Sequence, residues 1–79
     1  MNNEKLFKIV EPRYKLNAHL FTTMRENIPL SVEQFAAVIG WSVSYQYQLE
    51  EGKYITVSEK VAKEICSAFA RYGIGVKLI

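Results

Sequence analysis

The chain has few of the residues that hold a fold together covalently or through a metal. Its 79 residues include one cysteine, Cys66, and one histidine, His19. One cysteine cannot form an internal disulfide, and a metal centre needs several such ligands close together. We therefore expect no metal, no cofactor and no Cys–His catalytic pair, and no other group of residues indicates an enzyme.

Long apolar runs are also absent. The sequence has no stretch of about 18 apolar residues, which excludes a membrane-spanning helix by the usual length criterion. The start, MNNEKLFKIV, lacks the long apolar core of a secretory signal. These absences predict a cytoplasmic protein with no membrane partner, and no residue pattern indicates a small-molecule ligand.

Positive charge is missing from the middle of the chain. The whole sequence has a formal net charge of +2 and an isoelectric point near 8.8, which fits a nucleic-acid partner without requiring one. Residues 26–52, however, contain no lysine or arginine, and their charged residues are Glu26, Glu33, Glu50 and Glu51. This stretch cannot hold a polyanion by its own charge.

The sequence does have enough apolar residues for one modest core. Hydrophobic residues make up 49% of the chain and aromatic residues 13%, in a length below the roughly 100 to 200 residues of a typical domain. We expect a single domain. A chain this small often gains stability from a second subunit, which favours a homodimer.

The middle of the chain predicts two short helices that meet at a tight turn. Ser31 can cap the first helix and Gln34 completes a capping box with it, while Gly40 marks its end. Ser42 can cap the next helix, which we expect over residues 43–51. The buried face of the first helix, at helical spacing, would be Val32, Phe35, Ala36 and Ile39.

A further helix is expected on each side of this pair. Apolar residues at helical spacing begin at Leu16, and Pro29 ends that segment. After the pair, the residues TVSE form a capping box that starts at Thr56 and predicts a longer helix, which Gly73 ends. These helices together form a domain over residues 16–72.

The two ends of the chain favour extended structure. Residues 1–15 are interpreted as an N-terminal arm with a short strand at residues 6–10, because KLFKIV is rich in β-favouring residues and Pro12 stops regular structure. Residues 73–79 form a strand-like tail that can pair with the arm. The apolar residues of the tail are too many for so small a core, so we expect them to form the dimer interface with part of the last helix: Ile74, Val76 and Leu78.

Two short helices joined by a turn with glycine are typical of the helix-turn-helix. Residues 31–52 resemble the phage repressor and Cro family, also called the XRE type, and the similarity extends over residues 16–70. The resemblance implies a mainly α fold, a lambda-repressor-like four-helix bundle with possible short terminal β segments. The spacing of the two glycines argues against the winged MerR and excisionase types. The matching features are LS before the first helix of the pair, Ala36, Gly40, Trp41, Ser42, Leu49 and the closing EEG.

Two positions depart from the family pattern. The inward position midway along the second helix of the pair, usually Val or Ile in the family, is Gln46. Either Gln46 is half buried with a polar partner, or the helix rotates so that Tyr45 and Leu49 face the core. At the start of the first helix of the pair, Val32 stands where the family often has a phosphate-gripping Gln.

The resemblance also predicts which residues touch DNA. If Leu49 faces inward, the side chains that face outward and can contact bases are Val43, Ser44, Tyr47 and Gln48. Because this helix has no cation, the phosphate contacts must come from the flanks and from backbone N–H groups at a helix start. The predicted phosphate-contacting residues are Lys5, Lys8, Arg13, Lys15, Arg25, Ser31 and Lys53.

The family resemblance implies a sequence-specific DNA-binding transcriptional regulator, a dimeric repressor of the phage or antitoxin kind whose partner is double-stranded DNA. Composition alone does not imply this role. The acidic stretch keeps an alternative open, in which the same shape serves a protein-interaction module, such as an antirepressor or adaptor, that does not read DNA. An ordinary αα-corner that Tyr45 and Tyr47 cover against solvent is the simplest structural alternative.

Overall fold

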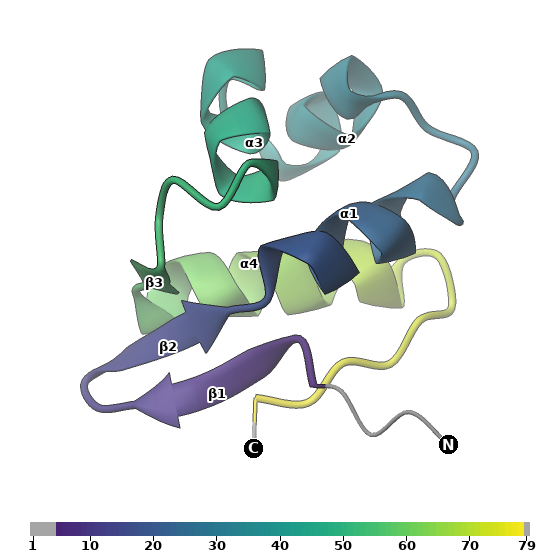
Figure 1. The fold of residues 1–79 in the computed structure, drawn as a ribbon. Helices are drawn as coiled ribbons and strands as arrows, with labels where there is room; N and C mark the ends of the chain where they lie inside the picture. The colour runs from purple at the N-terminus through teal and green to yellow at the C-terminus, as the bar shows by residue number, and fades with distance from the viewer. Residues whose placement is uncertain (1–4, 79) are drawn as a thin grey trace.

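Four helices pack beside a three-stranded antiparallel sheet (Figure 1). The computed structural model describes residues 5–78, and its strand order is β1-β2-β3. The fold is therefore mixed α/β, and the predicted four-helix bundle is wrong. The elements are β1 (Phe7–Val10), β2 (Arg13–Leu16), α1 (Ala18–Glu26), α2 (Val32–Ile39), α3 (Val43–Glu50), β3 (Thr56–Val57) and α4 (Glu59–Ala70).

The predicted N-terminal arm is a β-hairpin. β1 and β2 pair in register from Phe7 with Leu16 to Val10 with Arg13. Pro12 lies in the turn between them, where its missing N–H is not needed, so it does not end regular structure as the sequence suggested. Leu16 accordingly ends β2 and does not begin the first helix.

The hairpin has an apolar face and a basic face. Phe7 and Leu16 are buried in the core, whereas the neighbouring pair, Lys8 and Lys15, is exposed on the other side. Side chains alternate between the two faces of a strand, so one register determines both faces.

The third strand replaces the beginning of the predicted last helix. Thr56 and Val57 pair with β2, and Val57 is buried. The helix cap is therefore Ser58, whose side chain accepts a hydrogen bond from the backbone N–H of Val61. The capping box predicted from Thr56 is wrong, because Thr56 is already engaged in the sheet.

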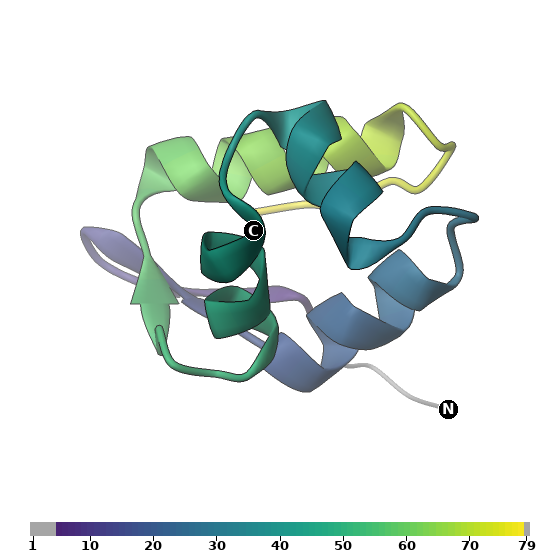
Figure 2. The same ribbon diagram turned by 90° about the horizontal axis from the view of Figure 1, so that it is seen from above.

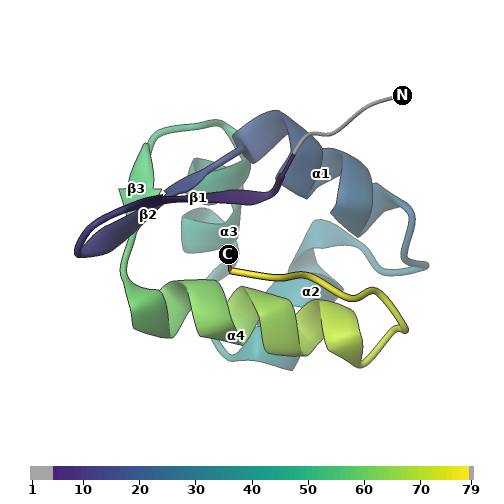
Figure 3. The same cartoon turned by 90° about the horizontal axis from the view of Figure 1, so that it is seen from below.

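The tail is extended but joins no sheet. Residues 74–78 have no regular secondary structure and run alongside α4 (Figure 3). Ile74, Val76 and Leu78 are half-buried and pack against the core of the same chain. Within residues 5–78, β1 pairs only with β2, so the predicted pairing of the two ends is not observed there. The predicted arm and tail also included residues 1–4 and Ile79, which lie outside the described residues.

The two helices at the tight turn are confirmed. α2 has the predicted bounds, and its capping box is complete: Gln34 N–H donates to Ser31 Oγ over 3.1 Å, and Ser31 N–H donates to Gln34 Oε1 over 2.9 Å. Gly40 follows in the left-handed conformation, with φ of 102°, and Ser42 caps α3. α3 ends at Glu50, one residue before the predicted end.

α2 and α3 form an upper layer above α1 and α4 (Figures 1 and 2). Three phenylalanines join these layers: Phe21 of α1, Phe35 of α2 and Phe69 of α4 are all fully buried, with ring centroids 5.4 to 6.0 Å apart. Aromatic contacts of this kind supply much of the apolar burial in a small core. The three phenylalanines fix α2 against α1 and α4. α3, which follows α2 after a short turn, lies at the edge of the molecule (Figure 1).

Candidate nucleic-acid interface

α3 presents the face that the sequence predicted. Leu49 is fully buried, while Ser44 and Tyr47 are exposed. Val43 and Gln48 lie at the two borders of this face and are half-buried. Ser44 and Tyr47 thus face outward as predicted, Val43 and Gln48 do so only in part, and contact of all four with bases stays a prediction.

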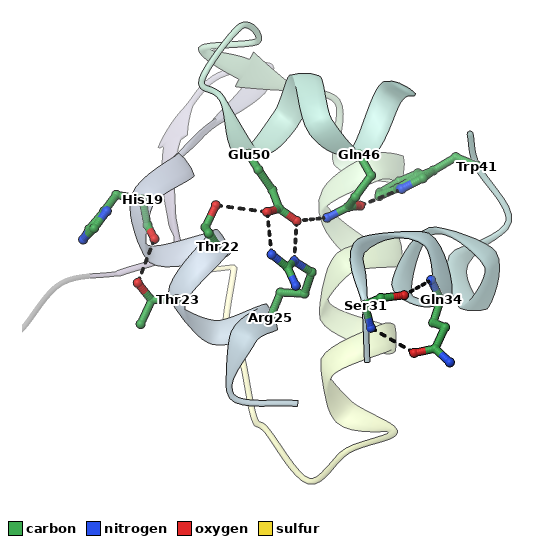
Figure 4. Close-up of polar contacts among 9 residues, drawn as sticks. All are labelled: His19, Thr22, Thr23, Arg25, Ser31, Gln34, Trp41, Gln46 and Glu50. Atoms are coloured by element: carbon green, nitrogen blue, oxygen red, sulfur yellow. Dashed lines mark hydrogen bonds and ion pairs between the residues drawn. The ribbon is translucent and has the colours of Figure 1, made fainter. Parts of the chain in front are cut away.

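The inner side of α3 carries a polar chain of hydrogen bonds (Figure 4). Trp41 Nε1 donates to Gln46 Oε1 over 2.8 Å, and Gln46 Nε2 donates to Glu50 Oε2 over 2.6 Å. Gln46 is fully buried. Of the two alternatives for this position, the one with a polar partner is therefore correct, although Gln46 is buried more deeply than expected.

Glu50 connects this chain of hydrogen bonds to α1. Arg25 donates to both carboxylate oxygens, from Nε to Oε2 over 2.6 Å and from Nη2 to Oε1 over 3.0 Å, and Thr22 Oγ1 donates to Oε1 over 3.3 Å. The side chains of Arg25 and Glu50 are only 10% and 8% exposed. The hydrogen bond to Glu50 is the main cause that raises the pKa of Arg25. A bidentate pair of this kind fixes both direction and distance between two helices.

The ion pair changes which charges reach the surface. The guanidinium of Arg25 is used inside the protein, so the structure does not bring it together with the other predicted phosphate-contacting residues. The carboxylate of Glu50 is neutralised by the same contact. The exposed acidic residues of the stretch 26–52 are Glu26, Glu33 and Glu51.

The outer border of α3 carries a row of aromatic rings. The ring of Trp41 meets that of Tyr45 edge to face at 5.0 Å, and Tyr45 meets Tyr54 at 5.4 Å between centroids. Burial is the main cause that raises the pKa of the Tyr45 hydroxyl, and Arg13 nearby opposes that rise. Tyr54 Oη donates to Gln48 Oε1 over 3.0 Å. Sequence patterns did not single out Tyr54, because it lies after the end of α3. Only the reversal of the chain after α3 brings Tyr54 into contact with that helix.

Figure 1 shows β3 between α3 and the hairpin of β1 and β2. Lys8 and Lys15 are directly opposite each other on the basic face of the hairpin, and Arg13 is beside them. Arg13 donates from Nε to Thr56 Oγ1 over 2.8 Å and from Nη2 to the Thr56 carbonyl over 3.0 Å. Three of the four predicted phosphate-contacting residues of the arm thus share one face of a sheet, which we call the basic sheet face: Lys8, Arg13 and Lys15.

Other predicted residues have separate positions. Lys5 precedes the hairpin and Lys53 follows α3, and both are exposed. Ser31 is exposed, but its hydroxyl already accepts the capping hydrogen bond. His19 lies on α1, where its carbonyl accepts a hydrogen bond from Thr23 (Figure 4). Among residues 5–78 no group of three or more His, Cys, Asp or Glu side chains could hold a metal ion.

Comparison of the chain with models of protein families, with curated proteins and with solved structures finds no match. In the described part of the chain, no helix has both the length and the apolar character needed to cross a membrane.

Proposed function

We propose that this chain is a sequence-specific DNA-binding regulator of the phage repressor or antitoxin kind, acting in the cytoplasm. The observation that carries the proposal is the position of α3. Ser44 and Tyr47 on its polar face are exposed and Gln48 is half-buried at the border of that face. β3 lies between α3 and the hairpin that carries the basic sheet face (Figure 1), and Arg13 of this face is near Tyr45 of α3. A helix of this kind can enter the major groove while nearby cations hold the phosphates.

The two tasks of base reading and phosphate holding are divided between two elements. α3 has no cation, so its contribution is hydrogen bonding and contact with base edges. The basic sheet face supplies charge instead. Lys8 and Lys15 face each other directly, which destabilises a sheet by like-charge repulsion. A phosphate backbone beside them would remove this repulsion.

A second candidate function is supported by the exposed carboxylates around α2 and α3. Glu26, Glu33 and Glu51 are exposed, and no lysine or arginine lies between residues 26 and 52 to offset them. An acidic surface of this shape suits a basic protein partner. In this alternative the chain is an antirepressor or adaptor and has no preference among DNA sequences.

DNA titrations at two salt concentrations test the proposal. Gln48→Ala should weaken binding to the preferred site and leave the salt dependence nearly unchanged. Neutralising the basic sheet face with Lys8→Gln, Arg13→Gln and Lys15→Gln should weaken binding to all duplexes. It should also reduce the slope of log affinity against log salt by about 0.9 for each phosphate that the three side chains neutralise in wild type.

A matched control removes the same number and kinds of charge elsewhere. Lys60→Gln, Arg71→Gln and Lys77→Gln lie on α4, just after it and on the tail, and all three residues are exposed. This variant should keep most of the salt slope. If wild type shows no preference among duplexes, or if both triple variants change the slope equally, the proposal is wrong and the protein-interaction alternative is favoured.

A further inference from the structure

Tyr54 holds the side chain of Gln48 on the exposed face of α3. The hydroxyl of Tyr54 donates to Gln48 Oε1 over 3.0 Å, so one lone pair of the amide oxygen is already occupied. The amide Nε2, with two N–H groups, is the part of Gln48 that this hydrogen bond does not use. The position of Tyr54 therefore affects what Gln48 can offer to a ligand.

The chain reversal after α3 fixes where Tyr54 lies. Gly52, with φ of 80°, closes the helix: its N–H donates to the Leu49 carbonyl over 3.2 Å, and Lys53 N–H donates to the Gln48 carbonyl over 3.0 Å. These two hydrogen bonds form the Schellman motif, which turns the backbone back along the helix. Tyr54 follows directly and lies beside the last turn of α3.

The ring of Tyr54 is held by the aromatic row. It packs on Tyr45, which in turn packs on Trp41, and the indole N–H of Trp41 is bonded to the buried Gln46. Two ring contacts and one hydrogen bond thus link the ring that carries the Tyr54 hydroxyl to the buried Gln46. A group held in this way loses little further freedom when a ligand binds, which favours a single orientation of the Gln48 amide.

We propose that Tyr54 determines which base Gln48 reads, by presenting the amide as a donor so that it prefers guanine over adenine. This inference rests on the proposed DNA binding. A glutamine that reads adenine uses its oxygen to accept from N6 and its nitrogen to donate to N7. The major-groove edge of guanine offers two acceptors, N7 and O6, which match the two N–H groups of Nε2.

Selection from a random duplex pool with Tyr54→Phe tests the inference. The change removes only the hydroxyl of a side chain that is 38% exposed, and the ring contact with Tyr45 remains. The position that Gln48 reads is first identified as the one whose base preference is lost in Gln48→Ala. At that position wild type should select guanine, and Tyr54→Phe should shift the ratio of guanine to adenine toward adenine by about five- to tenfold.

The matched control is Tyr72→Phe, which removes the hydroxyl of a comparably exposed tyrosine, 39%, beyond the end of α4. It should leave the selected sequence unchanged. If wild type and Gln48→Ala behave as proposed but Tyr54→Phe keeps the same base, the role of Tyr54 is wrong and the DNA-binding function stands. If Tyr54→Phe weakens all sequences equally, its hydroxyl acts on the phosphates and the inference is also wrong. If wild type selects no sequence, the proposed function fails and this inference fails with it.

Discussion

Gln46 is the residue on which the orientation of α3 most directly depends. Its buried amide accepts from Trp41 and donates to Glu50, so an apolar replacement leaves both partners without this hydrogen bond. Gln46→Leu should lower the free energy of unfolding by about 1–3 kcal/mol, the usual cost of an unpaired buried polar group. Urea denaturation measures this change. Ser44→Leu, at an exposed position of the same helix, serves as the control and should change stability by about 0.5 kcal/mol or less. A Gln46→Leu protein as stable as wild type would contradict the buried network.

The pair of Arg25 and Glu50 gives a second prediction for single residues. Removing one partner leaves the other charge buried and alone, so Arg25→Met should lower stability by about 3–5 kcal/mol. The double variant Arg25→Met with Glu50→Gln should recover much of that loss, because neither charge then remains in the interior and the new amide oxygen can still accept from Gln46. A double-mutant cycle in denaturant gives the coupling directly. Strictly additive losses would show that the two side chains do not interact.

These residues also show what sequence can and cannot predict at this scale. The inward position of Gln46 follows from helical spacing, because Leu49 lies three residues further along the same helix. Its partners are local as well, at positions 41 and 50. Arg25 is different: it was predicted at the surface, and its partner lies 25 residues away. Sequence spacing within a helix carries no information on such a distant contact.

At the scale of elements, the turn between α2 and α3 depends on Gly40. Its φ of 102° is one that side chains rarely adopt, and a Cβ there would meet no atom within 4 Å. The cost of Gly40→Ala is therefore backbone strain, and stability should fall by about 1–3 kcal/mol. Gly75→Ala is the control, since Gly75 has no such φ and equally open surroundings. Equal melting temperatures for the two variants would argue against the strained turn.

The tail provides a prediction that uses Cys66 as a reporter. Val76 and Leu78 lie around the same cavity as Cys66, and burial raises the pKa of its thiol. At neutral pH the thiol therefore stays protonated and reacts slowly. Val76→Ser should loosen the tail, lower the pKa toward its usual value and speed alkylation of Cys66, measured by mass spectrometry. Lys60→Ser, at an exposed position of α4 outside that cavity, should leave the rate unchanged. A Val76→Ser rate equal to that of wild type would mean that the tail does not protect the thiol.

The elements themselves differ in how far they could be predicted. α2 and the start of α3 follow from Ser31, Gln34 and Ser42, because caps are local hydrogen bonds within three residues. The sheet could not be found in this way. β2 pairs with β3 across about forty residues of chain, and the short strand Thr56–Val57 carries a pattern that also fits a helix start. The pairing of the buried Val57 with Tyr14 shows that these residues form a strand and do not begin the helix.

At the scale of the whole molecule, the arrangement of charge depends on the hairpin register. The basic residues of the arm are visible in the sequence, but no pattern there assigns them a common surface. Pairing Lys8 with Lys15 in β1 and β2 brings them to one face, with Arg13 beside them. The outward direction of Ser44 and Tyr47 was predictable because helical spacing and the inward Leu49 determine it. The position of Arg13 near Tyr45 of α3 was not, because it depends on the tertiary fold.

Dimerisation is also a property of the whole molecule. We propose that two copies associate, since a chain of this size often needs a second subunit and DNA sites of this class are commonly two-fold. Ile74, Val76 and Leu78 already pack on the core of their own chain, so a dimer through the tail would cover only the parts that remain open. Sedimentation at tens of micromolar should give the mass of a dimer, and the DNA site should then be a near-palindrome with half-sites about one helical turn apart. A monomeric mass would contradict the proposed dimerisation.

We propose that α3 reads a DNA sequence while the basic sheet face holds the DNA backbone. The most direct test is to sequence the duplexes that the wild-type chain retains from a random pool at moderate salt. The proposed function predicts enrichment of one short motif, with a position whose base preference disappears when the selection is repeated with Gln48→Ala. A retained pool that stays random in sequence would contradict it and would leave the acidic surface around α2 and α3 as a site for a protein partner.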